Sequence, residues 1–100
     1  MRKLPPRPRI IAVDVDDTLY GDSGCNRRLI AWCEQQKKSG FYLMLWSSRG
    51  EAHARNRANQ CGVADLFDLI CSKPGYVVDD QGWSWIKYTK VITSINEVVE

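Results

Sequence analysis

The sequence predicts a single α/β domain built around a parallel sheet. Short, continuous apolar runs of strand length alternate along the chain with longer segments whose apolar residues recur every three or four positions. The resulting order of strand, helix, strand, helix, strand, strand and helix is typical of this fold class. A length of 100 residues, of which 44% are hydrophobic and 26% charged, fits one globular domain with one core.

Four apolar runs are the predicted strands. The second of them, FYLMLW, is continuously apolar and too short for most helices, as expected of a strand that is buried on both faces. The third, FDLIC, is short, and the fourth, YVVDD, ends in two acids. The predicted strands cover residues 9–15, 41–46, 67–71 and 76–80.

Three segments show helical spacing of their apolar residues. This spacing predicts a helix from about residue 24 to residue 39, with Gly40 as its C-terminal stop. A second helix is expected over residues 51–61, and a third over residues 91–99, where the apolar residues are β-branched. Together the elements predict a Rossmann-like arrangement, a parallel sheet in the strand order 3-2-1-4 with helices on both faces.

The first eight residues predict a disordered arm ahead of a folded domain at residues 9–100, because three prolines among them prevent regular pairing. The arm is basic, but no apolar stretch follows it, so no signal peptide is expected. No run reaches the length of a membrane span, and no membrane partner is expected. The net charge of +2 favours no particular class of partner.

The four cysteines show neither the C-x-x-C pairing of redox motifs nor the spacing of zinc fingers. Cys71 ends an apolar run and Cys33 lies on the apolar stripe of a predicted helix, so we expect buried free thiols at Cys25, Cys33, Cys61 and Cys71. Free thiols imply a reducing compartment and hence a cytoplasmic protein. His53 is the only histidine, which argues against a histidine-based triad or zinc site.

Acidic side chains stand at the end of the first predicted strand and directly after it, at Asp14, Asp16 and Asp17. Burying a carboxylate is costly unless the carboxylate is paired or coordinated, so three acids against an apolar run require a partner. Residues two apart in an extended strand point to the same side. Asp14 and Asp16 are therefore expected to face one site, while Asp17 faces elsewhere.

Polar residues also follow two further predicted strands. Ser47 and Ser48 come after the second strand, and Asp79 and Asp80 end the fourth. In parallel sheets, ligands bind beyond the carboxyl ends of the strands. We therefore expect these side chains to converge with the acids of the first strand on one rim of the sheet.

Carboxylates held close together repel one another unless a divalent cation neutralises them. Mg²⁺ is the expected ion, because it prefers a few carboxylates together with water and phosphate oxygens. Ser47 adds a hydroxyl donor, and Lys73 adds a positive charge near the fourth strand. Acids, metal, hydroxyl and lysine together predict a phosphate site in which one carboxylate is free to act as a nucleophile.

Four short motifs occur along the chain, DVDDTL after the first strand, LMLWSSR at the end of the second, then SKP and VVDD. In this order they resemble the four motifs of the haloacid dehalogenase-like phosphohydrolases, over roughly residues 9–80. The resemblance implies a catalytic domain at residues 9–100 and a Mg²⁺-dependent phosphatase that works through an aspartyl-phosphate intermediate.

The resemblance implies a role for each motif residue. Asp14 would attack phosphorus and become the aspartyl phosphate, while Asp16 would protonate the leaving oxygen and then activate water. Ser47 would hydrogen-bond the transferring phosphoryl group, with Ser48 as the alternative if the strand runs one residue longer. Lys73 would neutralise charge on the nucleophile and on the phosphate.

The same resemblance implies the metal ligands. Mg²⁺ would be held by Asp14, the main-chain carbonyl of Asp16 and Asp79, with Asp80 as direct or water-mediated support. Arg49, just past the second motif, is a candidate contact to substrate phosphate, and a surface arginine at a helix start is the alternative interpretation.

The chain has no room for a cap domain. Family members that act on small metabolites usually carry one after the first motif or between the second and third, whereas residues 19–28 fit only a short flap and residues 50–72 only a helix and a strand. An open site can admit a nucleic-acid end, a nucleotide or a phosphorylated protein. A larger substrate could contact the flap, Arg49, His53, Trp83 or Trp85, although the two tryptophans also fit the core, where Trp46 is expected.

Two other function classes stay open. A receiver-like phosphoacceptor module also uses acids, a hydroxyl, a lysine and Mg²⁺, but its phosphorylated Asp ends a later strand than Asp14 does. A non-catalytic binding domain could keep an inherited site, although the presence of both Asp14 and Asp16 argues against it. Release of inorganic phosphate from a generic aryl phosphate would distinguish the enzyme from both alternatives.

Overall fold

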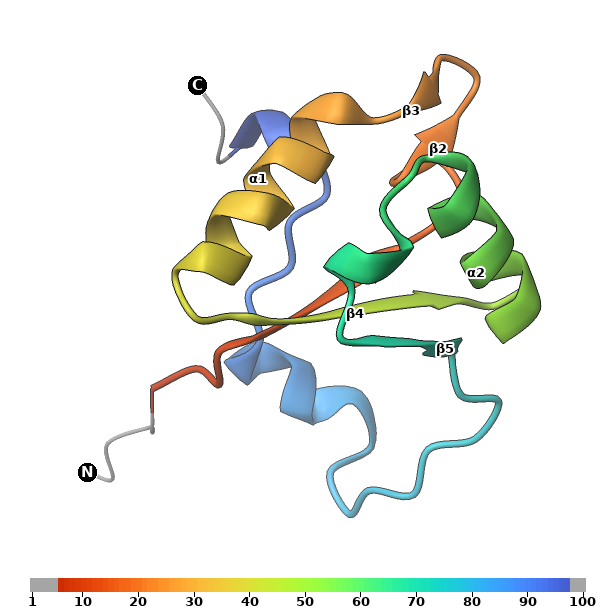
Figure 1. The fold of residues 1–100 in the computed structure, drawn as a ribbon. Helices are drawn as coiled ribbons and strands as arrows, with labels where there is room; N and C mark the ends of the chain where they lie inside the picture. Colours follow the sequence, from red (N-terminus) through yellow and green to blue (C-terminus); the bar gives the residue numbers. More distant parts are fainter. Residues whose placement is uncertain (1–5, 98–100) are drawn as a thin grey trace.

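The structure is a computed structural model that describes residues 6–97, and within them a parallel sheet, two α-helices and an antiparallel hairpin form one small α/β domain (Figure 1). The sheet order is β1-β4-β5, which agrees with the order predicted for the first three strands. The α/β class and the parallel sheet are therefore confirmed. The elements of the sheet and its helices are β1 (Ile10–Asp14), α1 (Arg27–Lys38), β4 (Tyr42–Ser47), α2 (Glu51–Gln60) and β5 (Leu69–Ser72).

The register of the sheet brings the ends of its strands to one edge. β1 pairs with β4 up to Asp14, which lies opposite Trp46. β4 pairs with β5 up to Ser47, which lies opposite Ser72. Because the three strands are parallel, the acids after β1 and the serines after β4 share the carboxyl edge, as the sequence predicts.

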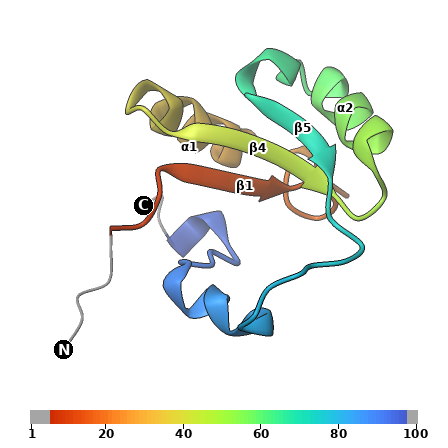
Figure 2. The same ribbon diagram turned by 90° about the horizontal axis from the view of Figure 1, so that it is seen from below.

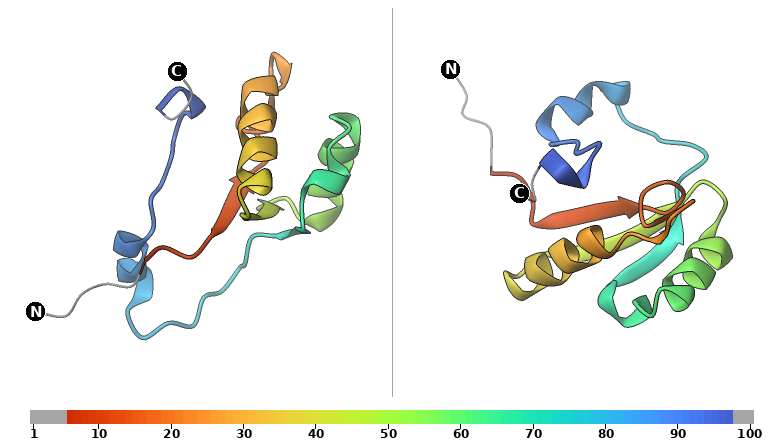
Figure 3. Two further views of the ribbon diagram at one scale, coloured as in Figure 1. Left: turned by 60° about the vertical axis from the view of Figure 1, so that its left-hand side comes forward. Right: turned by 90° about the horizontal axis from the view of Figure 1, so that it is seen from above.

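Helices α1 and α2 cover the same face of the sheet (Figures 2 and 3). Alternate strand residues point toward this face and form the core with the helices. The small side chains of Ala54 and Ala58 are fully buried and let α2 pack closely against the sheet. The buried apolar residues are Val13, Val15, Leu19, Leu29, Ile30, Cys33, Leu43, Leu45, Ala54, Ala58, Cys61, Val63, Phe67 and Ile70.

Helix α1 begins and ends at residues suited to those positions. The Asn26 side chain accepts the backbone N–H of Leu29 at 3.1 Å and caps the helix. Gly40, beyond the C-terminal end, has a φ of 98°, in the backbone region that favours glycine, so the predicted stop is confirmed. The helix begins later than residue 24 because Gly24 and Cys25 belong to a strand instead.

A short hairpin connects the turn after β1 to α1. Its strands, β2 (Tyr20–Gly21) and β3 (Gly24–Cys25), pair antiparallel, with Tyr20 opposite Cys25. Residues 20–25 are called the flap below. The predicted short flap is therefore present, and the fully described stretch between β1 and α1 contains no larger insertion.

Cys25 of the flap forms a disulfide with Cys61, the residue after α2. The prediction of buried free thiols is therefore wrong for this pair and confirmed for Cys33, whereas Cys71 is free but only half-buried. Cys25 and Cys61 are 36 residues apart in sequence while their Cα atoms are 5.8 Å apart, a proximity that cysteine spacing alone does not reveal. A cross-link over a loop of this length stabilises the fold by roughly 4 kcal/mol in the chain-entropy model.

The strand predicted over residues 76–80 is wrong. This segment has no regular structure, and residues Tyr76 and Val78 are exposed to 95% and 102% of their reference area. Pro74 and Gly75 stand directly before it and favour a turn, and Figure 2 shows the chain leaving the end of β5 and running away from the sheet. An apolar run becomes a strand only where its backbone finds a partner, and the apolar pattern does not determine the path of the chain.

The helix predicted over residues 91–99 is also wrong for residues 91–94, and residues 98–100 lie outside the described part of the chain. β-Branched residues lose side-chain freedom in a helix, which disfavours one here. From Asp80 to residue 97, where the described part of the chain ends, the helical segments are short 3₁₀ turns on the side of the sheet opposite α1 and α2. Within the described residues, α-helices therefore cover one face rather than both (Figures 2 and 3). The 3₁₀ turns are η1 (Ala64–Leu66), before β5, η2 (Gly82–Tyr88) and η3 (Ile95–Glu97).

The tryptophans lie outside the buried core. Trp46, expected in the core, is half-buried, because it alternates with the core residues of β4, and the Lys73 Nζ lies 5.8 Å from its ring. Trp83 is 67% exposed and Trp85 is half-buried, with their ring centroids 6.2 Å apart in η2. The prediction for Trp46 is therefore wrong.

Residues 1–5 of the predicted N-terminal arm lie outside the described part of the chain, and residues 6–8 are exposed without regular structure. Over residues 6–97, no helix combines the length and the apolar character needed to cross a membrane.

Asp68, just before β5, is bonded to the backbone of β4. Its carboxylate accepts the Leu43 N–H at 2.8 Å and lies 3.4 Å from the Lys37 Nζ. The Leu43 N–H, assisted by Lys37, lowers the pKa of Asp68. The ionised carboxylate therefore helps to fix the amino end of the sheet.

We expect Asp68→Asn to lower the Tm by several degrees at neutral pH, because the neutral amide loses the charge-assisted bonds. A lowered pKa in the folded state contributes stability above the unfolded pKa of about 3.9, and this contribution is lost as the pH falls through the folded value. The Tm difference between wild type and variant should therefore shrink in acid. Thermal melts across pH, with the exposed Asp65→Asn as control, measure it, and a pH-independent difference would contradict the assignment.

Candidate active site

Asp14 ends β1 with its carboxylate held by two partners. The Lys73 Nζ lies 3.1 Å from Asp14 Oδ1, and the Thr18 hydroxyl donates to Oδ2 at 3.2 Å. The side chains of Asp14 and Lys73 are 38% and 34% exposed, so solvent reaches the pair. The structure therefore brings together the predicted nucleophile and the predicted lysine.

Lys73 reaches Asp14 because the ladder between β4 and β5 continues past the end of β5. The Lys73 N–H donates to the carbonyl of Ser47 at 2.9 Å, directly after the last paired residue, Ser72. Strand β4 lies between β5 and β1, so the lysine side chain extends along the carboxyl edge toward β1. The side-chain position thus follows from the sheet order.

A tight turn after β1 holds Asp16. The N–H groups of Thr18 and Tyr20 donate to the Val15 carbonyl at 3.1 and 3.0 Å, and the Asp17 N–H donates to the Tyr20 carbonyl at 2.8 Å. Asp17 has a φ of 60°, a left-handed conformation that aspartate adopts more readily than most residues. The turn fixes Asp16 at the edge of the sheet and directs the Thr18 hydroxyl back toward the end of β1.

Helix α2 supplies the partner of Asp16. The His53 Nε2 lies 3.0 Å from Asp16 Oδ1, and an Arg49 guanidinium nitrogen lies 3.9 Å from the same oxygen. The hydrogen bond from His53, together with the positive charges of His53, Arg49 and Arg57, lowers the pKa of Asp16. Asp16 is therefore ionised at neutral pH, and its carboxylate accepts the His53 N–H.

The sequence predicts His53 as a contact to a larger substrate and does not predict its bond with Asp16. The His53 side chain is 17% exposed, so most of it is enclosed by the protein. A usable signal was its position in the first turn of a helix that begins just after the second motif. Such a helix starts above the carboxyl edge of a parallel sheet, which places its first side chains near the acids after β1.

Ser47 is the last residue of β4, and Ser48 lies exposed beyond the strand. Ser47 is only 1% exposed, and its hydroxyl accepts the Arg49 N–H at 3.0 Å. Because the hydroxyl accepts in this bond, its own proton can be donated to another group. In this structure Ser47 orders the start of the loop to α2, and its contact with a phosphoryl group stays a prediction.

The structure does not group the two acids of the fourth motif with Asp14 and Asp16. Asp79 and Asp80 are exposed on the irregular segment after β5, where the Asp79 carboxylate accepts the Gln81 N–H at 2.8 Å. Within residues 6–97, no three His, Cys, Asp or Glu residues are placed to hold a metal ion together. The assignment of Asp79 and Asp80 as metal ligands stays a prediction.

The donors at the carboxyl edge nevertheless fit Mg²⁺. This ion is commonly held by one or two carboxylates and completes its coordination with water and phosphate oxygens. Asp14 offers a solvent-accessible carboxylate, and Asp16 offers hard oxygens in the adjoining turn. These two residues meet the minimum that the ion requires.

Two shallow, open depressions of the surface flank the flap. One has a volume of about 420 Å³ and lies between the flap and α2, where Asp16, Asp17, Tyr20, Arg49 and Arg57 line it. The other, of about 470 Å³, lies between the flap and the start of α1. The first depression includes Asp16, so the surface beside the candidate site is open to solvent.

Comparison of the chain with protein-family models, with curated proteins and with solved structures finds no match.

Proposed function

We propose that this protein is a Mg²⁺-dependent phosphomonoesterase that uses Asp14 as its nucleophile. The observation that carries the proposal is the pairing of Asp14 with Lys73 and Thr18 beside Asp16 and its partner His53, at the carboxyl edge of a parallel sheet. Ligands bind at this edge in such folds. The resemblance of the four sequence motifs to the haloacid dehalogenase-like phosphohydrolases supports the same activity.

In the first half of the reaction, an Asp14 carboxylate oxygen attacks phosphorus and the bond to the leaving oxygen breaks. The product is an aspartyl phosphate on Asp14 and an alcohol. Lys73, 3.1 Å from the carboxylate, offsets the negative charge that nucleophile and phosphoryl group bring together. Thr18 holds the other carboxylate oxygen and so orients the attacking one.

Asp16 serves both halves of the reaction. Its carboxylate must first take up a proton, which it then delivers to the leaving oxygen; ionised again, it takes a proton from the water that hydrolyses the aspartyl phosphate. The lowered pKa of Asp16 suits the second task, in which an ionised carboxylate is needed. The lowered pKa also makes proton delivery the harder of the two tasks, because an ionised carboxylate carries no proton. His53, whose Nε2 lies 3.0 Å from Asp16 Oδ1, is the neighbouring group that can share a proton with Asp16.

Mg²⁺, when bound to Asp14 and the main-chain carbonyl of Asp16, would polarise the phosphoryl oxygens and neutralise their charge. Asp79 is the further ligand that the motif resemblance implies, with Asp80 in support. Arg49, Ser47 and Lys73 are the proposed contacts to the phosphate.

The proposed substrate is a phosphomonoester on a molecule large enough to use the open edge. The flap is short, and Arg49 and Arg57 line the open depression beside Asp16. These features support a nucleic-acid end, a nucleotide or a phosphorylated protein over a small metabolite that depends on a cap. A cytoplasmic location is part of the proposal, although the Cys25–Cys61 disulfide removes two of the thiols on which it rested.

We expect purified protein to release inorganic phosphate from p-nitrophenyl phosphate when Mg²⁺ is present, and excess chelator to abolish this release. Ca²⁺ should inhibit, because it takes more and longer oxygen contacts and would draw the carboxylate out of line. Parallel assays on a mononucleotide, an oligonucleotide with the same terminal phosphate and a phosphopeptide identify the substrate class. Absence of phosphate release from all of them, or release unchanged by chelator, would contradict the proposal.

A further inference from the structure

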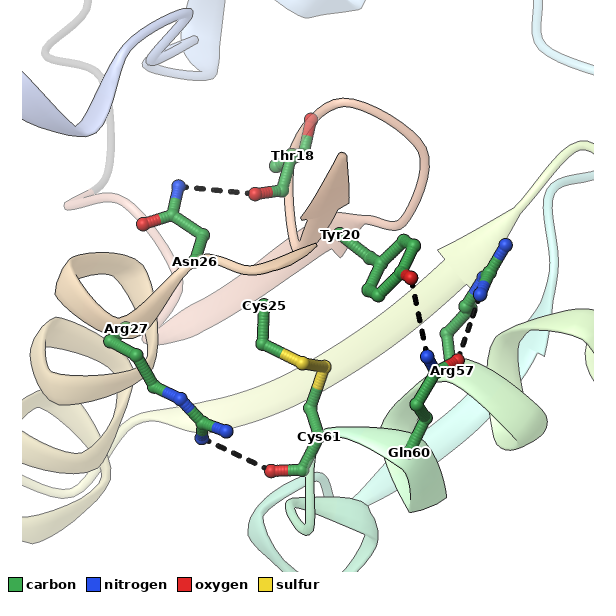
Figure 4. The surroundings of a disulfide bond; sticks show 8 residues. All are labelled: Thr18, Tyr20, Cys25, Asn26, Arg27, Arg57, Gln60 and Cys61. Carbon is green, nitrogen blue, oxygen red and sulfur yellow. Dashed lines mark hydrogen bonds between the residues drawn. A yellow bond between two sulfur atoms is a disulfide. The ribbon is translucent and has the colours of Figure 1, made fainter. Parts of the chain in front are cut away.

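The Cys25–Cys61 disulfide joins the flap to the residue after α2 (Figure 4). The flap and α2 both border the candidate site. Cys25 belongs to the flap, and Cys61 follows α2, the helix that carries His53. The proposed reaction does not use the disulfide. The position of the disulfide therefore indicates that this bond holds the flap against α2.

The other contacts between flap and α2 centre on one side chain, Tyr20. The Arg57 guanidinium lies 4.0 Å from the centroid of the Tyr20 ring, and the Gln60 amide donates to the Tyr20 hydroxyl at 3.2 Å on the exposed surface (Figure 4). The hydrogen bond from Gln60 is exposed, so water competes for both of its partners and the bond breaks and re-forms readily. The disulfide is the one covalent link between the flap and α2 in the described chain.

The flap is directly continuous with the turn that holds Asp16. The Asp17 N–H donates to the Tyr20 carbonyl at 2.8 Å, the Asn26 N–H donates to the Leu19 carbonyl at 2.8 Å, and the Asn26 side-chain amide donates to the Thr18 carbonyl at 3.2 Å. Displacement of the flap would therefore strain or break bonds in the segment that orients Thr18 and Asp16.

We propose that the Cys25–Cys61 disulfide is a site of reversible reduction by a dithiol, and that its reduction releases the flap from α2. The consequence for turnover rests on the proposed phosphatase function, whereas the release of the flap does not.

The chemistry is thiol–disulfide exchange. A thiolate of the dithiol attacks the Cys25 Sγ, which belongs to the less buried of the two cysteines, and the Cys61 Sγ leaves as a thiolate that takes a proton from solvent. The second thiol of the reductant then attacks the mixed disulfide, so that Cys25 becomes a thiol and the reductant becomes a disulfide. Two electrons pass from the dithiol to the protein.

Neighbouring groups support this direction of attack. Arg27 donates to the main-chain carbonyl of Cys61 at 3.2 Å, which places a positive charge close to the residue that leaves as a thiolate (Figure 4). Burial raises the pKa of the Cys33 thiol to about 12, so Cys33 does not supply a competing thiolate. The buried Cys33 thiol therefore takes no part in the exchange.

The test compares the full chain before and after treatment with dithiothreitol, and again after reoxidation. Alkylation under denaturing conditions should count two thiols in the oxidised protein and four in the reduced protein, since Cys33 and Cys71 are free in both. Hydrogen exchange should accelerate at least tenfold for the amides of residues 19–26 on reduction, with little change in β4. Turnover of p-nitrophenyl phosphate should fall severalfold, and reoxidation should restore both values.

Two variants sharpen the result. The double variant Cys25→Ser, Cys61→Ser should match the reduced wild type with or without dithiothreitol, whereas Cys71→Ser, which keeps the disulfide, should respond as the wild type does. Unchanged flap exchange after full reduction would overturn the proposal, and so would general acceleration that includes β4, because the bond would then stabilise the whole fold. If reduction accelerates hydrogen exchange in the flap but the protein hydrolyses no phosphoester, the proposed function is overturned, whereas the proposal of a reducible disulfide is supported.

Discussion

Replacing Asp14 by Asn should lower kcat for phosphoester hydrolysis by roughly 10⁴-fold or more, as is seen when an enzyme loses its nucleophile. An amide nitrogen or oxygen does not form the aspartyl phosphate, so the first half of the proposed reaction stops. The loss corresponds to at least about 5 kcal/mol of transition-state stabilisation. Steady-state turnover of p-nitrophenyl phosphate in the presence of Mg²⁺ measures it.

The fold should survive this change. Asn has nearly the same shape as Asp, and its side-chain oxygen can still accept the Thr18 hydroxyl that now donates at 3.2 Å. Removing the partner of Lys73 leaves an ammonium that is 34% exposed and can be solvated. The circular dichroism spectrum and Tm of the variant should therefore stay close to those of the wild type.

A matched control is available at Asp65, an exposed acid in η1 at the opposite edge of the sheet. Asp65→Asn makes the same chemical change away from Asp14, and it should leave turnover unaltered. If Asp14→Asn keeps wild-type activity, or if Asp65→Asn loses as much, Asp14 is not the nucleophile.

The sheet and its carboxyl edge, where the candidate site lies, could be predicted because the local sequence pattern agrees there with the tertiary structure. The run FYLMLW is continuously apolar and becomes the central strand β4, with both neighbours in place. Gly40 ends α1 because glycine adopts a φ of 98° without a steric penalty. At such positions propensity, burial and turn chemistry all favour the same outcome.

The C-terminal third could not be predicted in the same way. The run YVVDD has strand-forming residues, yet Val78 is fully exposed because no strand lies beside it. β-Propensity describes how well a side chain fits a pleated, half-buried surface, and it has no effect where that surface is missing. The disulfide could not be predicted either, because Cys25 and Cys61 come together only through the packing of the flap against α2.

In the candidate site, too, some contacts could be predicted from the sequence and others could not. Asp14, Ser47 and Lys73 lie at or directly after the ends of adjacent strands, so the parallel order alone brings them to one edge. The bond between His53 and Asp16 requires the angle at which α2 leaves the sheet, which no motif encodes. Asp79 follows a segment whose path the apolar pattern does not determine, and it is not grouped with the other acids.

Replacing Asp16 by Asn should lower kcat by about 10²- to 10⁴-fold, the usual contribution of a general acid–base group. The amide oxygen of the substituted side chain can still accept the His53 N–H that now lies 3.0 Å from the carboxylate, so the turn after β1 should keep its shape. Proton transfer to the leaving oxygen and from the attacking water both suffer.

Substrates with different leaving groups distinguish the loss of proton transfer to the leaving oxygen from the loss of proton transfer from the attacking water. p-Nitrophenolate leaves readily without a proton, whereas the alkoxide of a nucleotide or an alkyl phosphate needs one, so Asp16→Asn should be more damaging on the alkyl ester. With the aryl ester, hydrolysis then becomes the slower half, and the aspartyl phosphate should accumulate on Asp14. Rapid acid quenching followed by mass spectrometry detects it as a phosphorylated chain, which Asp14→Asn should never show. Equal losses on both esters with no trapped phosphoprotein would assign the proton transfers to another group, and His53, in contact with Asp16, would be the next residue to replace.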